Sequence, residues 1–242
     1  MSEDGGRQAV SEDGGRQAMS EDGGRQTKTA LFDGFARIGR ALASGRRLEL
    51  MDLLAQGERS VDELAAAAGL SSANASQHLQ VLRGAGLVAS RQDGVRVYYR
   101  LASPRVVALL DDLREVAYDR SAEVRALAEE YLGGDVEPVD REQLERLLEE
   151  EDIVVVDVRP RDEFAAGHID HARSIPLDEL RERLSELPDD RLIVAYCRGR
   201  FCAYSHDAVR LLEESGRRAR RLEDGFPEWQ LAGLPSVRGG GG

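Results

Sequence analysis

Residues 70–88 read L-S-S-A-N-A-S-Q-H-L-Q-V-L-R-G-A-G-L-V, and this stretch decides the fold of the first half of the chain. Its spacing predicts one helix that begins at a serine N-cap and ends near Gly84. Ala75, Leu79 and Leu82 fall on one face of that helix. We expect this face to pack inward, because residues three and four apart lie above one another.

The opposite face of the same helix is polar and has no acidic side chain. An ordinary solvated helix usually carries Glu and Lys, whereas amide and hydroxyl groups can hydrogen-bond to base edges in a DNA groove. The face is therefore predicted to enter the major groove. Its candidate base-reading residues are Ser72, Asn74, Ser76, Gln77 and Gln80.

Helical patterns precede this stretch. Apolar residues recur at helical spacing over 29–56, with Gly45 between two helices. A shorter helix is predicted from Val61 to Ala68, where Ser60 and Glu63 have the spacing of a capping box.

A β-ribbon and a long helix are predicted to follow. The strands Leu87–Arg91 and Val95–Leu101 are joined by a turn that contains Asp-Gly, a tight-hairpin signal. Arg91 and Arg96 in this ribbon are candidates for phosphate contacts.

Pro104 opens an amphipathic helix that we expect to run to about Leu132. Two short helices and a ribbon in this order are typical of a winged helix-turn-helix.

These motifs resemble those of arsenical-repressor (ArsR-type) regulators. The resemblance rests on residues 70–88 and on the ribbon sequence D-G-V-R-V-Y-Y-R-L at 93–101, and it covers roughly 29–130. It implies a homodimer, built from the first helix and the long last helix, that binds double-stranded DNA at an inverted repeat. The metal-sensing residues of the family are not matched here, and His78 is expected to be structural. We therefore expect no metal.

A different pattern begins after Asp140. The runs Ile153–Val158 and Leu192–Tyr196 are almost continuously apolar, as expected for strands buried on both faces. Predicted helices alternate with them at 141–151, 161–166, 177–186, 203–215 and 227–232. This alternation predicts an α/β domain with a parallel sheet flanked by helices. The fold class is thus two domains, a mainly α winged helix-turn-helix with a β-hairpin wing and then the α/β domain.

The stretch Y-C-R-G-R-F-C-A-Y-S at 196–205 places a cysteine between a buried strand and a helix. Backbone N–H groups at a helix start favour an anion, and Arg198 and Arg200 add positive charge. Cys197 is therefore predicted to be an acidic, nucleophilic thiol. Cys202, five residues later, is a candidate resolving thiol, or else a small apolar residue at the helix start. The predicted catalytic loop is Cys197, Arg198, Gly199, Arg200, Phe201 and Cys202.

Around this loop the chain resembles a single-domain rhodanese. The matching motifs are D-V-R at 157–159, E-F-A-A-G-H-I at 163–169, A-R-S-I-P at 172–176 and D-G-F-P-E-W-Q-L-A-G-L-P at 224–235. The resemblance implies sulfurtransferase chemistry through a Cys197 persulfide, with a small donor such as thiosulfate or a persulfide. Asp157, Arg159 and His168 are expected to brace the loop. Asp170-His171 departs from the Pro-Gly common in the family, which we expect to alter only a surface turn.

A phosphatase of the same fold would need C-x5-R, and the position of that arginine is Ala203. Phosphatase activity is therefore not expected.

The composition limits the remaining possibilities. The net charge is −12, yet residues 71–105 hold five arginines against one acid, so DNA binding is favoured there alone. No apolar run is long enough for a membrane span or a secretory signal, so we expect a cytoplasmic protein without a membrane partner. We expect no cofactor.

The predicted domains follow from these patterns. Residues 1–27 are three copies of a unit that begins S-E-D-G-G-R-Q, and we expect them to be disordered. The boundaries are 1–27 for this repeat, 28–132 for the winged helix, 133–139 for a linker, 140–237 for the rhodanese-like domain and 238–242 for a disordered glycine tail.

The leading hypothesis is a transcriptional regulator, most simply a repressor, whose second domain senses or transfers reactive sulfur. Its rival is a sulfurtransferase whose winged helix only dimerises or localises it. In a third hypothesis the rhodanese-like fold binds a partner and Cys197 is a vestigial acceptor.

Overall fold

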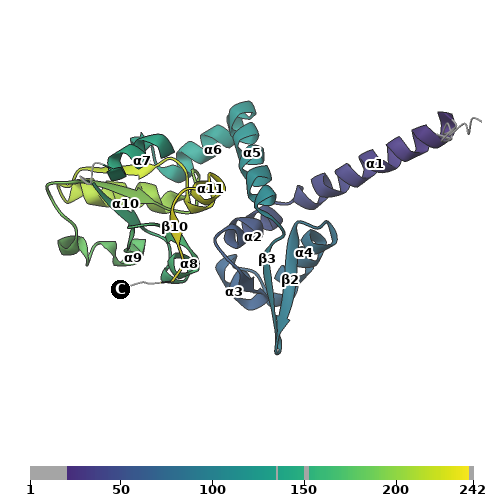
Figure 1. The fold of residues 1–242 in the computed structure, drawn as a ribbon, viewed down its shortest axis with the longest axis horizontal. Coiled ribbons are helices and arrows are strands. Elements are labelled where there is room, and N and C mark those ends of the chain that lie inside the picture. Colours follow the sequence, from purple (N-terminus) through teal and green to yellow (C-terminus); the bar gives the residue numbers. More distant parts are fainter. Residues whose placement is uncertain (1–20, 135, 150–152, 240–242) are drawn as a thin grey trace, which may run out of the picture. The chain divides into compact units, whose positions relative to one another are not determined.

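The computed structural model describes residues 21–134, 136–149 and 153–239 (Figure 1). The described residues divide into two compact units, with the boundary between Arg40 and Ala41. Among the described residues no helix combines the length and apolarity that a bilayer crossing requires.

The first described element is the helix α1 (Glu21–Leu42). Residues 21–27 of the third repeat unit are therefore helical, and the expectation that they are disordered is wrong. The helix continues without a break from these residues into the apolar pattern that begins at Leu31. Residues 1–20 lie outside the described part of the chain.

The winged helix-turn-helix is confirmed. Its elements are α2 (Gly45–Ala55), β1 (Arg59–Ser60), α3 (Val61–Ala67), α4 (Ser72–Gly84), β2 (Val88–Asp93) and β3 (Arg96–Leu101). The three strands form an antiparallel sheet in the order β1-β3-β2. Ser60 and Glu63 form the predicted capping box, and the Ser71 side chain caps α4 by accepting from Asn74 N. Ala75, Leu79 and Leu82 are completely buried, as predicted.

The long helix predicted from Pro104 to Leu132 is in fact two helices, α5 (Pro104–Arg120) and α6 (Ala122–Leu132). Ser121 separates them in an extended conformation, and its hydroxyl accepts from Val124 N at 3.2 Å. The serine acts as an N-cap, which competes with a continuous helix. Gly133 ends α6 in the left-handed conformation with φ 74°.

The second half of the chain is an α/β structure. Its strands are β4 (Pro138–Val139), β5 (Ile153–Asp157), β6 (His168–Ile169), β7 (Arg173–Ser174), β8 (Leu192–Tyr196), β9 (Ala219–Leu222) and β10 (Ser236–Val237). Its helices are α7 (Arg141–Glu149), α8 (Arg161–Ala166), α9 (Leu177–Leu180), the 3-10 turn η1 (Leu184–Glu186), α10 (Ala203–Glu214) and α11 (Phe226–Leu231).

Five of these strands form a parallel sheet in the order β4-β9-β8-β5-β7. One face packs against α9 and α10 through residues such as Val156 and Ala208, and the other packs against α7 and α11 through residues such as Val155 and Trp229. Two covered faces explain why β5 and β8 are almost continuously apolar.

The predicted linker at 133–139 is only partly correct. Pro138 and Val139 form β4 and pair with Arg221 and Leu222 of β9, so they belong to the sheet. At the other end, Gly239 N donates to Ala165 O, which ties the start of the predicted tail to α8. Residues 240–242 lie outside the described residues.

Candidate functional site

The candidate site is the segment between β8 and α10, residues 197–202, which we call the sulfur loop. Cys197 follows directly after β8, at the carboxyl edge of the sheet, and Cys202 is the N-cap residue of α10. The structure joins the two cysteines in a disulfide bond. Cys197 is 1% exposed, whereas Cys202 is half-buried. Of the two bridged cysteines, Cys202 is therefore the more exposed residue.

The backbone of the sulfur loop is held on both sides. Cys202 N donates to Gly199 O at 3.0 Å, and Phe226 N donates to Cys197 O at 3.2 Å. Gly225 approaches the loop so closely that a Cβ there would lie 2.2 Å from Gly199 N. The start of α11 thus fixes the loop.

The positive charges of Arg198 and Arg200 are more fully neutralised by carboxylates than the sequence suggests. Arg198 Nη2 lies 2.6 Å from Glu163 Oε1, whose side chain is completely buried. Arg200 lies 3.8 Å from Glu223 and stacks over the ring of Tyr118. Because carboxylates compensate both guanidinium groups, any stabilisation of a Cys197 thiolate depends more on the start of α10.

The three residues that we expected to brace the loop, Asp157, Arg159 and His168, are all buried. The fully buried Arg159 forms an ion pair with Asp157 at 2.6 Å and donates to Gly167 O at 2.7 Å. His168 is buried, stacks on Phe164 and contacts Phe164 O through Nδ1. His171 has φ 64° and lies in an exposed turn, as the departure at Asp170-His171 suggested.

A contact that sequence reasoning missed links the sulfur loop to the winged helix. Gln56, just after α2, is 3% exposed. Its amide donates to Arg198 O at 3.4 Å and accepts from Arg159 Nη1 at 3.0 Å. Arg59 of β1 binds Glu163 at 2.8 Å, so Glu163 holds one arginine from each half of the unit.

A cavity of about 260 Å³, which we call the loop cavity, opens beside Cys202. It is lined by Leu48, Glu49, Asp52, Arg114, Tyr131, Arg198, Gly199, Phe201 and Cys202. Residues of α2, α5 and α6 therefore form one wall and the sulfur loop forms the other.

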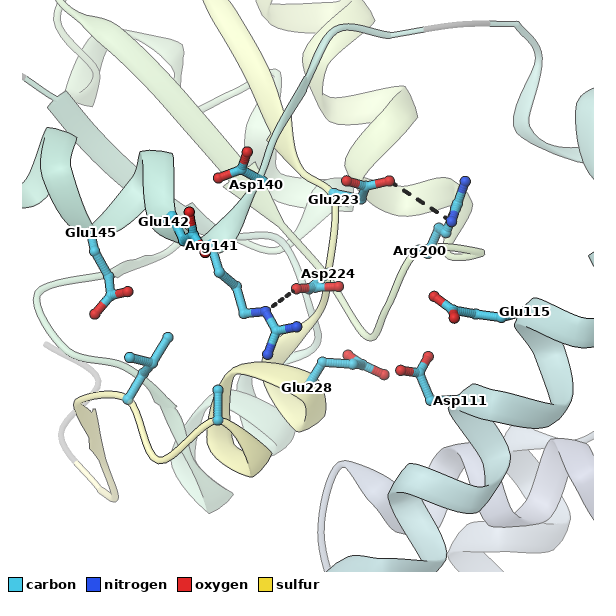
Figure 2. A pocket seen from close by; sticks show the side chains of 12 residues that line it. Asp111, Glu115, Asp140, Arg141, Glu142, Glu145, Arg200, Glu223, Asp224 and Glu228 are labelled. Carbon is cyan, nitrogen blue, oxygen red and sulfur yellow. Dashed lines mark ion pairs between the residues drawn. The ribbon is translucent and has the colours of Figure 1, made fainter.

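A second cavity, of about 690 Å³, lies between α5 and α11 and is strongly acidic (Figure 2). Figure 2 shows the carboxyl groups of Glu228 and Asp111 pointing toward one another. Burial raises the pKa of Glu228 to about 7, and burial also raises the pKa of Asp111. Within the described ranges no three His, Cys, Asp or Glu side chains are grouped to hold a metal ion.

The predicted DNA-reading residues are placed together on α4. Ser72, Asn74, Gln77 and Gln80 are exposed and Ser76 is half-buried. In the wing, Arg91 is bound by Glu58 and by Asp93 at 3.1 Å. Arg96 is exposed; its guanidinium bonds to the side chain of Tyr98, and the carboxylates of Glu63 and Asp62 act on it at longer range. Arg96 is therefore the better candidate for a phosphate contact.

Comparisons with known families agree with both halves of the fold. Residues 44–90 match the bacterial regulatory protein, arsR family, and residues 140–232 match the rhodanese-like domain.

Individual proteins resemble the chain over different lengths. The HTH-type transcriptional regulator Rv0324 of Mycobacterium tuberculosis is 48% identical over 212 residues, which cover 88% of this chain and 94% of that protein. A sulfurtransferase of Allochromatium vinosum is 37% identical over 42% of this chain and 95% of its own length. The solved homodimeric winged helix-turn-helix domain of Mb0332 from Mycobacterium bovis is 47% identical over 40% of this chain and 89% of that fragment, with a TM-score of 0.38.

The similarity to Rv0324 extends along most of the chain rather than over one half alone. The chain therefore belongs to the HTH-type transcriptional regulators that carry an arsR-family winged helix followed by a rhodanese-like domain.

Proposed function

We propose that this regulator is a homodimeric repressor whose affinity for its DNA operator is set by sulfur chemistry in the sulfur loop. The observation that carries the proposal is the position of that loop. The loop contains the disulfide-bonded cysteines. Its Arg198 contacts Gln56 of the winged-helix half, and it also contacts Glu163, which binds Arg59 of that half.

The chemistry needs only a sulfane sulfur donor and the two cysteines. The Cys197 thiolate attacks the outer sulfur of thiosulfate, the S–S bond of the donor breaks, and sulfite leaves with the electron pair. The product is a persulfide on Cys197.

The Cys202 thiolate then attacks Cys197 Sγ and expels hydrosulfide. The two thiols are oxidised to a disulfide, and the transferred sulfur is reduced to sulfide. The bridge between Cys197 and Cys202 supports this second step, because it places Cys202 within reach of Cys197.

The DNA side of the proposal rests on α4 and the wing. Ser72, Asn74, Ser76, Gln77 and Gln80 would read bases in the major groove, while Arg96 and, to a lesser degree, Arg91 would contact phosphate. The exposed polar face of α4 and the net positive charge of 71–105 support this assignment.

The second copy of the chain would cover apolar side chains that this copy leaves exposed. Phe32 and Phe35 on α1 are 59% and 60% exposed, and Val116 on α5 and Leu127 on α6 are 61% and 57% exposed. Large apolar groups at this exposure favour burial in an interface. Light scattering should give the mass of two chains.

A sulfurtransferase is the second candidate, favoured by the similarity of the rhodanese-like half to the Allochromatium sulfurtransferase. It predicts steady turnover of thiosulfate and no specific DNA complex.

One gel-shift experiment tests the proposal against this alternative. The DNA is the segment upstream of the chain's own gene, and the protein is either reduced or treated with thiosulfate. We expect a specific complex with the wild type, an affinity that changes on sulfur treatment, and loss of the specific complex in Gln77→Ala. Equal binding to random DNA, or no response to thiosulfate, would contradict the proposal.

A further inference from the structure

The walls of the loop cavity carry charges of both signs. Arg114 and Arg198 are its cations, and Glu49 and Asp52 are its anions. Arg114 Nη2 lies 2.6 Å from Asp52 Oδ1, and their side chains are still 29% and 31% exposed. These groups are therefore accessible to a ligand that enters the cavity. Arg198 is paired with Glu163 and Glu49 with Arg46, so the charges around the cavity balance and would not favour an inorganic dianion.

The size of the cavity also argues for an organic ligand. A volume of about 260 Å³ is the space of roughly nine water molecules in the liquid. A small inorganic ion would fill only part of it. Leu48, Phe201 and Tyr131 provide apolar surface beside the charges, which suits a short carbon skeleton.

Access to the disulfide is one-sided. Cys202 lines the loop cavity, whereas Cys197 is 1% exposed. A molecule in the cavity therefore lies beside Cys202 rather than Cys197.

We propose that the loop cavity binds a zwitterionic organic thiol, one that carries both an ammonium and a carboxylate group, and presents it to Cys202 to open the bridge. Arg114 binds the carboxylate, and Asp52 and Glu49 bind the ammonium. The inference rests on the proposed function, in which the disulfide must be reduced before the protein can respond to sulfur again.

The reaction balances with the thiol as the only reductant. Its thiolate attacks Cys202 Sγ, the bond between Cys202 and Cys197 breaks, and the electron pair leaves on the Cys197 thiolate. A second thiolate then attacks the sulfur of the bound thiol, which releases a free organic disulfide and the Cys202 thiolate. Two thiols are oxidised and one protein disulfide is reduced.

The test measures reduction of full-length protein that has been bridged with diamide. The zwitterionic probe is cysteine, and the uncharged control is 2-mercaptoethanol at the same thiolate concentration. We expect the rate with cysteine to saturate, as it does when binding precedes reaction, and the rate with 2-mercaptoethanol to rise linearly.

Arg114→Gln should lower the rate constant for dilute cysteine about tenfold, the size expected from loss of one hydrogen bond to a charged group. It should leave the rate with 2-mercaptoethanol unchanged, which also shows that the variant is folded. Arg120→Gln, an exposed arginine of the same helix outside the cavity, is the matched control and should match the wild type with both thiols.

The site of attack is read from the trapped mixed disulfide. Trypsin cleaves after Arg198 and Arg200, so the two cysteines fall on different peptides. Cysteine bound to the Cys202 peptide supports the inference. Cysteine bound to the Cys197 peptide, or a linear rate that Arg114→Gln leaves unchanged, overturns it. A bridge that diamide forms but thiosulfate does not would instead count against the proposed function alone.

Discussion

At the scale of single residues, the sulfur loop depends on the absence of a side chain at Gly225. A Cβ there would lie 2.2 Å from Gly199 N and 2.3 Å from Arg198 C, both backbone atoms that cannot swing aside. The φ of Gly225 is −115°, so the requirement is for space rather than for an unusual backbone conformation. Any larger residue must displace the loop that carries Cys197.

Gly225→Ala should therefore lower the free energy of unfolding by about 1–3 kcal/mol, the usual cost of overpacking, and slow sulfur loading of Cys197. Gly84→Ala is the control, because a Cβ at Gly84 meets no atom within 4 Å. Thermal unfolding and intact-mass measurement after thiosulfate treatment check both effects. Normal stability and normal loading in Gly225→Ala would show that the close approach is not a constraint.

Glu228 makes the stability of the protein depend on pH. Burial raises its pKa from 4.5 to about 7, so the folded state retains a proton that the unfolded chain has lost between these values. The free energy of unfolding should fall as pH rises from 4.5 to 7, by up to about 3 kcal/mol, and this contribution should stay constant above pH 7. Glu228→Gln should flatten that part of the curve. Urea unfolding at several pH values measures it, and an unchanged slope in the variant would assign the pH dependence to other groups.

At the scale of elements, the sequence predicts what local patterns determine. The capping box of Ser60 and Glu63, the strand β8 and the helix α8 all occur at their predicted residues, because capping and burial on two faces leave clear local signals. The break at Ser121 was missed because a serine is compatible with both a helix interior and an N-cap. The strand β4 was missed because only its pairing with β9 defines it.

The wing offers a matched pair of arginines for a test of phosphate contact. Arg96→Ala should weaken binding to all DNA sequences alike and reduce the salt slope by about one phosphate contact. Arg91→Ala should have a smaller effect, because Glu58 and Asp93 already hold Arg91 in ion pairs. Fluorescence anisotropy over a range of salt concentrations compares the two. The reverse order would mean that DNA displaces the carboxylates from Arg91.

At the scale of the whole molecule, hydrogen bonds connect the rhodanese-like half to the winged helix, and no sequence pattern predicts them. Gln56 and Arg198 are separated by 142 residues, and Arg59 and Glu163 by 104. The sequence identified the sulfur loop and the DNA-reading face separately, but these contacts depend on how the folded chain brings them together. Glu163 is the shared partner of Arg59 and Arg198 and thus the simplest place to interrupt the connection.

Glu163→Gln should retain DNA binding and sulfur loading but reduce the difference in operator affinity between the reduced and bridged forms. The variant loses the carboxylate that Arg198 and Arg59 share, so a change in the loop should alter the winged helix less. Glu179→Gln removes a carboxylate of α9 that binds Arg161 and Arg183, and it serves as the control. Titrations of operator DNA with both forms of each variant provide the ratio. A wild-type ratio in Glu163→Gln would place the coupling in another contact.

The most direct test of the central claim follows operator affinity and protein mass together in the wild type, Cys197→Ser and Cys202→Ser, before and after thiosulfate. A tenfold change in affinity requires that bridging shift the binding free energy by only about 1.4 kcal/mol. The wild type should bridge and change its affinity. Cys202→Ser should gain sulfur without bridging or switching, because the resolving thiol is missing. Cys197→Ser should gain no sulfur and keep one affinity throughout. If Cys197→Ser still changes its affinity on sulfur treatment, the switch does not lie in the sulfur loop.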